Sequence, residues 1–225
     1  MAKVQFFITG TDTNVGKTTI TAGLLYKFKQ YGLSTAALKP IASGDACRET
    51  DTDILKNAIT RTFAPEEITP FAFAPAIAPH IAASLQREEL NVAKIVKACQ
   101  SVLQSDTDVL LIEGCGGWLV PLNSTETMAD LVKTLKLSVI LVVGIRLGCL
   151  NHALLTYQHI GNMDIDVAGW VANIIDPEVT YCEQQINILQ QYIAAPLVGI
   201  IPHQPLVKLT KIAAYLNIAA LLKLT

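Results

Sequence analysis

The chain has 225 residues, of which 51% are hydrophobic and 16% are charged, and its formal net charge is −2 at pH 7. This composition excludes an intrinsically disordered protein, and the small net charge gives no support for binding nucleic acid or an anionic membrane. The longest apolar run, from Leu137 to Ile145, is far shorter than the roughly 20 residues that cross a bilayer. Five scattered cysteines without a C-x-x-C pair favour reduced thiols over disulfides or zinc. We therefore expect a cytoplasmic protein that binds neither nucleic acid nor membrane.

Short apolar segments alternate along the chain with segments of helical periodicity. Several of the apolar segments lack alternation, as expected where both faces of a parallel strand are covered. The expected strands are Val4–Thr9, Thr35–Lys39, Val109–Ile112, Val139–Val143, Val167–Ala172 and Leu197–Ile201. The expected helices are Lys17–Tyr31, Asp53–Ile59, Val92–Leu103, Met128–Leu135, Asn151–His159 and Tyr181–Tyr192. This order predicts a single α/β domain over residues 1–225, with a parallel sheet covered by helices on both faces. The proline-rich connection from Phe63 to His80 is of a length that is often functional.

A phosphate-binding loop follows the first strand, with the sequence GTDTNVGKTT from Gly10 to Thr19. Such a loop turns backbone N–H groups toward phosphate oxygens, and the following helix adds its positive end. Lys17 can place its charge on the β- and γ-phosphates of ATP, and Thr18 can place its hydroxyl on Mg²⁺. The loop has five residues rather than four before Gly-Lys, so Thr11 stands where glycine is usual. The motif predicts a P-loop NTPase-like fold that binds nucleotide through Thr13, Asn14, Val15, Gly16, Lys17, Thr18 and Thr19. The alternative is a glycine-rich turn with a surface lysine.

The segment EGCGGW, from Glu113 to Trp118, follows the third expected strand. P-loop enzymes place a magnesium-binding carboxylate at the end of such a strand, and Mg²⁺ prefers carboxylate, hydroxyl and phosphate oxygens. The glycines allow the backbone to approach a ligand closely. We therefore expect Glu113, Gly114, Cys115 and Gly116 at the nucleotide site; a solvated strand end is the alternative.

Four further segments narrow the family. They are Lys39–Gly44 (KPIASG), Gly144–His152 (GIRLGCLNH), Gly169–Asn173 (GWVAN) and Pro196–Pro202 (PLVGIIP). Together with the phosphate loop, and in their order and spacing, they resemble the dethiobiotin synthetase family. The resemblance extends from the first strand to about Pro202, and Lys-Pro-x-x-Ser-Gly combined with Glu-Gly-x-Gly-Gly-Trp is its specific part.

This resemblance implies an ATP-dependent cyclo-ligase of biotin biosynthesis that uses Mg²⁺. One amine of 7,8-diaminononanoate would add CO2, and the carbamate would attack the γ-phosphate of ATP. The second amine would then close the ring of dethiobiotin and release phosphate beside ADP. No protein nucleophile is needed, because a protein accelerates phosphoryl transfer mainly by positioning and charge neutralisation.

The resemblance also implies roles for individual residues. Lys17 and Lys39 would be catalytic, and Ser43 would bind the diamino substrate. The metal ligands would be Thr18, Asp53 and Glu113. Asn173 would read the adenine edge, with Pro202, His203 and Gln204 bordering the base. The helix start formed by Gly148, Cys149, Leu150 and Asn151 would receive the substrate carboxylate from the neighbouring subunit of a homodimer, since a helix N-terminus suits an anion.

Structural alternatives remain for several of these residues. Asp51 is the rival of Asp53, which lies in a stretch suited to capping a helix. Lys39 could be a solvated strand end, Ser43 a turn residue, and Asn173 a cap. His80 could line the substrate pocket or be structural, and the two tryptophans, Trp118 and Trp170, favour packing roles. The chain departs from relatives at Asn14, where many carry Glu, at Gln185, where one presents a Tyr, and after Pro202, where no acid follows to bind ribose.

Two rival classes are weakened by the sequence. Partitioning ATPases of the deviant P-loop kind carry a signature lysine early in the loop, where this chain has Asp12. P-loop amidoligases of the cobyrinate type need a glutaminase domain, for which 225 residues leave no room.

Overall fold

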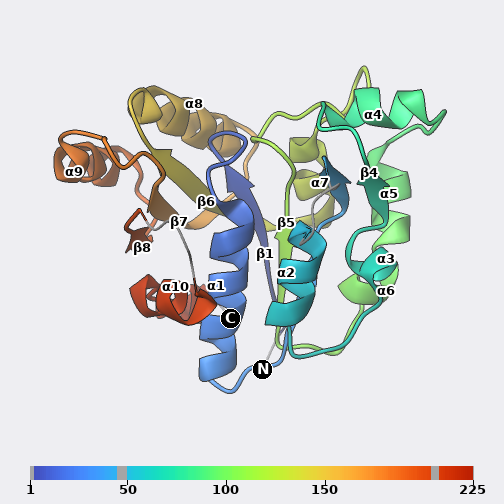
Figure 1. Ribbon diagram of the computed structural model, residues 1–225, viewed down its shortest axis with the longest axis horizontal. Helices are drawn as coiled ribbons and strands as arrows, with labels where there is room; N and C mark the ends of the chain where they lie inside the picture. The colour runs from blue at the N-terminus through green and yellow to red at the C-terminus, as the bar shows by residue number, and fades with distance from the viewer. Residues whose placement is uncertain (1–2, 45–49, 204–207, 225) are drawn as a thin grey trace.

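The structure, a computed structural model, describes residues 3–44, 50–203 and 208–224, and a parallel sheet lies at its centre (Figure 1). Within these residues the sheet has six strands in the order β2-β5-β1-β6-β7-β8. Their bounds are β1 Val4–Gly10, β2 Thr35–Leu38, β5 Val109–Glu113, β6 Ser138–Ile145, β7 Val167–Ile174 and β8 Leu197–Ile201. All neighbouring strands run parallel. The expected α/β fold class and all six expected strands are confirmed.

Helices cover both faces of the sheet (Figure 1). Phe6 and Ile8 of β1 pack in a core with residues of α1, α2 and α10, while Phe7 between them packs in a second core with residues of α5 and α7. A third core joins β6 and β7 to α8 and α9. The alternation follows from the two-residue period of a strand. The helices are α1 Lys17–Gln30, α2 Asp51–Ala58, α3 Pro65–Ile68, α4 Pro79–Leu85, α5 Val92–Ala98, α6 Gln100–Leu103, α7 Met128–Leu135, α8 Cys149–Asn162, α9 Cys182–Tyr192 and α10 Leu209–Tyr215, followed by the 3₁₀ turn η1 Leu221–Leu224.

The proline-rich connection is more ordered than its sequence indicates. It contains α3 and the strand β4 (Phe71–Phe73), which pairs in parallel with β3 (Ile41–Ser43) as a separate two-stranded sheet. Pro65 and Pro79 each occupy the first turn of a helix, where proline has no N–H to lose. Pro65 and Pro79 therefore mark the starts of helices α3 and α4.

Several helix boundaries differ from expectation, and α2, for example, spans Asp51–Ala58 rather than Asp53–Ile59. The helix expected over Val92–Leu103 is interrupted at Cys99, which separates α5 from α6. Helix α8 begins two residues earlier than Asn151 because Gly148, with a φ of 87°, provides its left-handed N-cap. The first turn of α8 is therefore Cys149, Leu150 and Asn151.

Helix α10 was not expected from the sequence, and it packs against α1 (Figure 1). A Cβ atom at Gly23 of α1 would lie 2.3 Å from Cγ2 of Ile212, so the two helices are in close contact there. The chain also returns to the sheet edge, since Leu216 forms an isolated antiparallel bridge with Gly199 of β8. Within the described residues, no helix combines the length and apolar character that crossing a membrane requires.

Candidate active site

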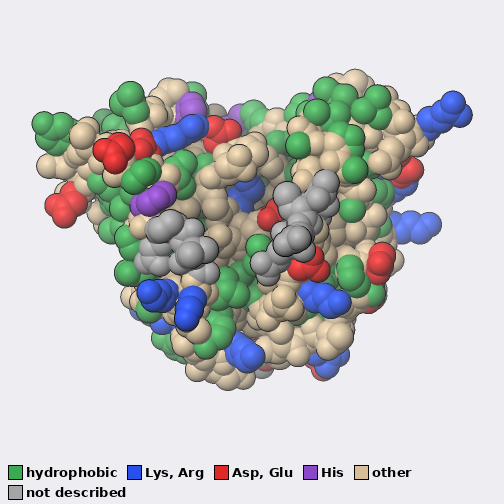
Figure 2. All heavy atoms as spheres, in the orientation of Figure 1, with side chains coloured by type: hydrophobic (Ala, Val, Ile, Leu, Met, Phe, Trp, Pro, Cys, Tyr) green, Lys and Arg blue, Asp and Glu red, His purple; other side chains and the backbone are tan. Residues whose placement is uncertain are grey.

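A cleft of about 990 Å³ opens at the carboxyl ends of the central strands. Figure 2 shows this face hollowed near its middle, where basic and acidic side chains lie close together. Four parts of the chain line the cleft. They are the phosphate loop (Thr13, Asn14 and Gly16–Thr19), Lys39 with Ala42–Gly44 and the start of α2 (Asp51, Ile54), residues Ala76–Pro79, and the segment after β5 (Glu113, Cys115–Gly117 and Leu119–Pro121).

The phosphate loop has the strand–loop–helix geometry that its sequence predicts. Gly16 has a φ of 87°, and a Cβ atom there would lie 2.3 Å from Nδ2 of Asn173, so only glycine fits. Asn173, on β7, donates a 2.8 Å hydrogen bond to the carbonyl oxygen of Val15, which is buried beneath the loop. Neither Val15 nor Asn173 is among the residues that line the cleft. Their contact supports the loop from behind.

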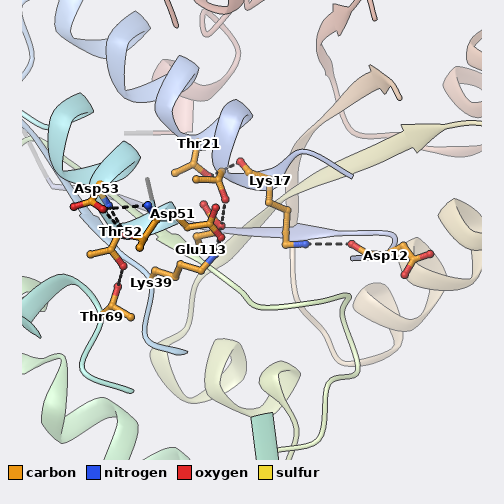
Figure 3. Close-up of polar contacts among 11 residues, drawn as sticks. Asp12, Lys17, Thr21, Lys39, Asp51, Thr52, Asp53, Thr69 and Glu113 are labelled. Carbon is orange, nitrogen blue, oxygen red and sulfur yellow. Dashed lines mark hydrogen bonds and ion pairs between the residues drawn. The ribbon is translucent and has the colours of Figure 1, made fainter. Parts of the chain in front are cut away.

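Strand register brings Lys39 and Glu113 together. Leu38 of β2 is the register partner of Ile112 of β5, so the next residue of each strand lies at the same edge. The ammonium of Lys39 donates to Oε1 of Glu113 at 2.8 Å and also to Oδ2 of Asp51 (Figure 3). Thr18 donates its hydroxyl to the same Glu113 oxygen at 2.7 Å. Thr18 of α1 and Lys39 after β2 therefore meet at the Glu113 carboxylate, and Lys39 links that carboxylate to Asp51 of α2.

Glu113 also retains capacity to bind a cation. Its Oε2 atom is buried and has no hydrogen-bond partner among the described residues. An unpartnered carboxylate oxygen beside a threonine hydroxyl and a second carboxylate is a donor set that suits Mg²⁺, which keeps several water or phosphate ligands of its own. The residues Thr18, Asp51 and Glu113 therefore fit a magnesium ion.

The pKa values of the two lysines in the cleft are shifted in opposite directions. Burial lowers the pKa of Lys17, with nearby Glu113 acting in the other direction and Lys39 adding to the lowering. Burial would also lower the pKa of Lys39, but its contacts with Glu113 and Asp51 outweigh that effect and raise it. Lys39 is therefore a permanent cation, and Lys17, which donates only to the carbonyl oxygen of Asp12 at 3.1 Å among the described bonds, is the cation open to an anionic ligand.

The structure places the Asp53 carboxylate in a helix cap rather than among the residues that line the cleft. Its carboxylate accepts hydrogen bonds from the backbone N–H of Thr50 at 3.1 Å and from the Thr50 hydroxyl at 2.7 Å. Thr50 in turn caps α2 through the N–H of Asp53, which completes a capping box. Figure 3 shows Asp53 apart from Glu113, whereas Asp51 lies beside it. Asp51, the rival in the sequence, is the acid that reaches the cleft.

The glycine-rich segment after β5 divides between the cleft and the core. Cys115 and Gly116 line the cleft, but Gly114 does not, and a Cβ there would lie 2.9 Å from the ring of Phe7. Gly114 is therefore needed for packing against β1. Burial raises the pKa of the Cys115 thiol to about 11, against the attraction of Lys39 and Lys17.

Most of the remaining sequence candidates lie outside this cleft. Ser43 lines it, but Gly148, Cys149, Leu150 and Asn151 do not, and neither do Pro202 and His203. Gln204 is outside the described residues. His80 lines a separate, shallower cavity of about 510 Å³ with Ser84 and Asn123. Trp118 and Trp170 are buried, which agrees with packing roles, and Trp118 donates a 3.0 Å hydrogen bond to Nδ1 of His159.

The apolar wall of the cleft was not expected from the sequence. It is formed by Ala76, Ile77, Ala78, Pro79, Leu119, Val120 and Pro121. Ile77 and Leu119 are partly exposed there, which is unusual for large apolar side chains in a polar cleft. The length of the proline-rich connection was a signal that its residues, among them Ala76–Pro79, could be functional. No sequence pattern indicated the part of the wall that follows Trp118.

Comparisons with known proteins agree with this geometry. A family model described as an AAA domain matches residues 4–210. A protein named ATP-dependent dethiobiotin synthetase BioD from Pseudomonas aeruginosa is 44% identical over 221 residues, which cover 96% of this chain and 97% of that protein. A protein of the same name from Cellvibrio japonicus is 43% identical over 227 residues, covering 99% of both chains.

Solved structures with a similar fold are more distant in sequence. The MinC:MinD cell division complex of Aquifex aeolicus matches with a TM-score of 0.57 at 16% identity, covering 90% of this chain and 82% of that one. The cell division protein FtsY of Thermotoga maritima matches with a TM-score of 0.54 at 15% identity, covering 90% of this chain and 63% of that one. At such identities the likeness concerns the fold alone.

Proposed function

Because the chain belongs to the ATP-dependent dethiobiotin synthetase family, a family of ligases, we propose that it closes the ureido ring of dethiobiotin from 7,8-diaminononanoate and CO2. ATP supplies the energy, and the other products are ADP and phosphate. The observation that carries the proposal is a single cleft that is lined both by Lys17, Thr18, Lys39, Asp51 and Glu113 and by a set of apolar side chains. We further propose that residues 1–225 act as a single cytoplasmic domain.

The charged part of the cleft lining is the proposed site of phosphoryl transfer. Loop amides and Lys17 would bind the β- and γ-phosphates, and the positive end of α1 would add to their attraction. Lys39, a permanent cation beside Glu113, would neutralise charge on the transferring group. Most of the rate enhancement would come from this positioning and charge, because phosphoryl transfer needs little covalent help from the protein.

Mg²⁺ is part of the proposal. Thr18, Asp51 and Glu113 would hold it, and it would supply charge neutralisation at the β- and γ-phosphate oxygens. The support is the Oε2 atom of Glu113, which has no hydrogen-bond partner in the described part of the chain, and the adjacent threonine hydroxyl.

The chemistry proceeds in three steps. One amine of the substrate adds CO2 and loses a proton to become a carbamate. A carbamate oxygen attacks the γ-phosphorus, and the bond from that phosphorus to the ADP oxygen breaks. The second amine then attacks the carbamoyl carbon of the mixed anhydride, and phosphate leaves as the ring closes. Ser43, which lines the cleft between Ala42 and Gly44, is the proposed hydrogen-bonding partner of the diamine.

The rest of the substrate would extend along the apolar wall. An aliphatic chain suits the side chains of Ile77, Pro79 and Leu119, whose burial by the substrate would stabilise the complex. The carboxylate at its far end would reach the first turn of α8 in the partner of a homodimer. Leu147, just before α8, is 92% exposed, and Leu155, in the middle of α8, is 60% exposed. Large apolar side chains with such exposure support a subunit interface at α8.

A direct assay tests the proposed function. Purified protein is incubated with Mg-ATP, bicarbonate and 7,8-diaminononanoate, and dethiobiotin and ADP are quantified by mass spectrometry. We expect one ADP for each dethiobiotin, and no dethiobiotin without ATP. Nucleotide hydrolysis that is indifferent to the diamino acid would contradict the proposal and favour a nucleotide-driven switch.

A further inference from the structure

An ion pair behind the cleft joins the phosphate loop to the turn that begins α8. The guanidinium of Arg146 donates to Oδ2 of Asp12, and both side chains are about two-fifths exposed. Neither residue lines the cleft, and Figure 3 shows Asp12 on the far side of Lys17 from Glu113. The pair is therefore placed to act on the site indirectly.

Asp12 is bonded at three points. Its Oδ1 accepts from the backbone N–H of Thr13 at 2.7 Å, its Oδ2 binds Arg146, and its carbonyl oxygen accepts from the ammonium of Lys17 at 3.1 Å. Asp12 thus contacts Thr13 of the phosphate loop, Lys17, and Arg146, which follows β6. The bond to the Asp12 carbonyl oxygen is the hydrogen bond that the Lys17 ammonium makes among the described residues.

Arg146 is bonded to α8 in a similar way. It directly follows β6, and its carbonyl oxygen accepts from the N–H of Cys149, the first residue of α8, at 3.1 Å. This bond closes the turn in which Gly148 adopts its left-handed conformation. The position of the Arg146 backbone therefore sets the direction in which the first turn of α8 points.

The two bonded ends have little freedom to move independently. The N–H of Thr11 donates to the carbonyl oxygen of Val142 at 3.0 Å, which ties the loop to β6. A Cβ atom at Gly144 would lie 2.8 Å from Cγ1 of Val15, so β6 and the loop are packed without a gap. A shift of the loop is thus transmitted to the segment that follows β6.

We propose that Arg146 is a positioning residue that, through Asp12, couples nucleotide binding at the phosphate loop to binding of the second substrate's carboxylate at the first turn of α8. The proposal rests on the proposed function, which places that carboxylate at α8 of the partner subunit. A half-exposed ion pair contributes little to global stability. We therefore expect loss of the ion pair to change the energetic coupling between the two ligands rather than global stability. Such coupling typically changes the affinity for one ligand by about 5- to 150-fold when the other is bound.

A double-mutant cycle tests the coupling. The variants are Arg146→Met, Asp12→Asn, which keeps the oxygen that accepts from Thr13, and the double variant. We expect each single change to raise the KM for the diamino acid about tenfold and to change the Kd for Mg-ADP less than about twofold. The double variant should be no worse than the worse single one, because both changes break the same contact.

Two controls complete the design. Arg146→Lys retains the charge and should restore most of the affinity for the diamino acid. Lys94→Met removes an ion pair with Glu88 of similar exposure outside the cleft and should leave both constants unchanged. Thermal midpoints are measured for every variant.

Three results would overturn the coupling role. The first is an unchanged KM for the diamino acid in Arg146→Met. The second is multiplication of the single effects in the double variant, which means that Arg146 contacts substrate without Asp12. The third is loss of nucleotide binding together with a lowered thermal midpoint, which means that the pair is only structural. Failure of the proposed function is separately visible, since the wild-type protein would then form no dethiobiotin in the same assay.

Discussion

The ammonium nitrogen of Lys39 lies 2.8 Å from Oε1 of Glu113, and the side chains of both residues are almost completely inaccessible to solvent. A buried charge pair of this kind contributes less than its geometry indicates, because both ions lose their hydration. Breaking it from one side is costly, since the remaining charge is left buried without a partner. The pair that we assign to phosphoryl transfer is therefore also a determinant of stability in the absence of ligands.

We predict that Lys39→Met lowers the free energy of unfolding by about 3 kcal/mol in the absence of nucleotide and Mg²⁺, because Glu113 loses its ammonium partner. The double variant Lys39→Met/Glu113→Gln should recover at least half of that loss, since its buried amide carries no charge. Urea unfolding followed by circular dichroism measures both. Additive losses in the double variant would show that the two residues do not act as a pair.

The two aspartates at the start of α2 form a matched pair of substitutions. Asp51→Asn should raise the Mg²⁺ concentration needed for half-maximal activity at least about tenfold, because it removes one of the proposed ligand charges. Asp53→Asn should leave that requirement unchanged and slightly lower the thermal midpoint, because Asp53 belongs to the capping box with Thr50. Magnesium titrations of both variants decide between them. A larger magnesium effect for Asp53 would return it to the site.

Lys17→Ala should reduce turnover at least about 100-fold, which corresponds to roughly 2.7 kcal/mol of transition-state stabilisation. Lys17→Arg is the informative companion, because it keeps the charge but not the shape that fits the loop. Steady-state kinetics with a circular dichroism check of folding give the result. Near-normal turnover in a folded Lys17→Ala protein would remove the phosphate-loop assignment.

The shared-site model predicts complementation between two inactive subunits. Asn151→Pro removes a backbone N–H in the first turn of α8, where proline is tolerated, while Asn151→Ala retains it and serves as the control. In a mixed dimer of Asn151→Pro with Lys17→Ala, one site carries both defects and the other carries neither. After random exchange, about a quarter of wild-type activity should return. A mixture that stays inactive after verified exchange, or an active monomer by light scattering, would exclude a shared site.

The raised pKa of the Cys115 thiol predicts slow alkylation. With a pKa of about 11, the reactive thiolate is roughly one part in a thousand at pH 8, and its share rises about tenfold for each pH unit below the pKa. Iodoacetamide should therefore label Cys182, which is less buried, well before Cys115, as measured by peptide mass spectrometry. Mg-ADP should slow labelling of Cys115 further, because that thiol lines the cleft. Labelling of Cys115 at a rate independent of pH would contradict the assignment.

Sequence patterns predicted the elements that depend on local chemistry. The six sheet strands, the phosphate loop and the acid at Glu113 were recognisable because apolar runs, glycines and a Gly-Lys-Thr motif act within a few residues. The convergence of Lys39 with Glu113 depends on which strands are neighbours, and strand order is not written in any local pattern. The resemblance to a family placed Lys39 and Glu113 in one site, because it implied a catalytic role for Lys39 and a metal-binding role for Glu113.

The choice between Asp51 and Asp53 shows where the resemblance to a family outweighed a local helix-capping signal. Thr50-x-x-Asp53 has the spacing of a capping box, which commits Asp53 to the backbone and starts the helix at Asp51. Asp51 is then free to turn toward Lys39. The apolar wall around Ile77 and Leu119 had no comparable signal, because it forms only when two connections that are distant in the sequence line the same cleft.

The contact between α1 and α10 bears on how the chain folds. Helix α1, which follows the phosphate loop, buries one of its faces against Ile212, and the two elements are separated by almost the whole sheet. Contacts of such long sequence separation slow folding, because the intervening chain must be ordered before they form. During synthesis, the apolar face of α1 would stay exposed to solvent until α10 has emerged from the ribosome. We expect this interval to be the period of greatest aggregation risk, in which a chaperone would most increase the yield of folded enzyme.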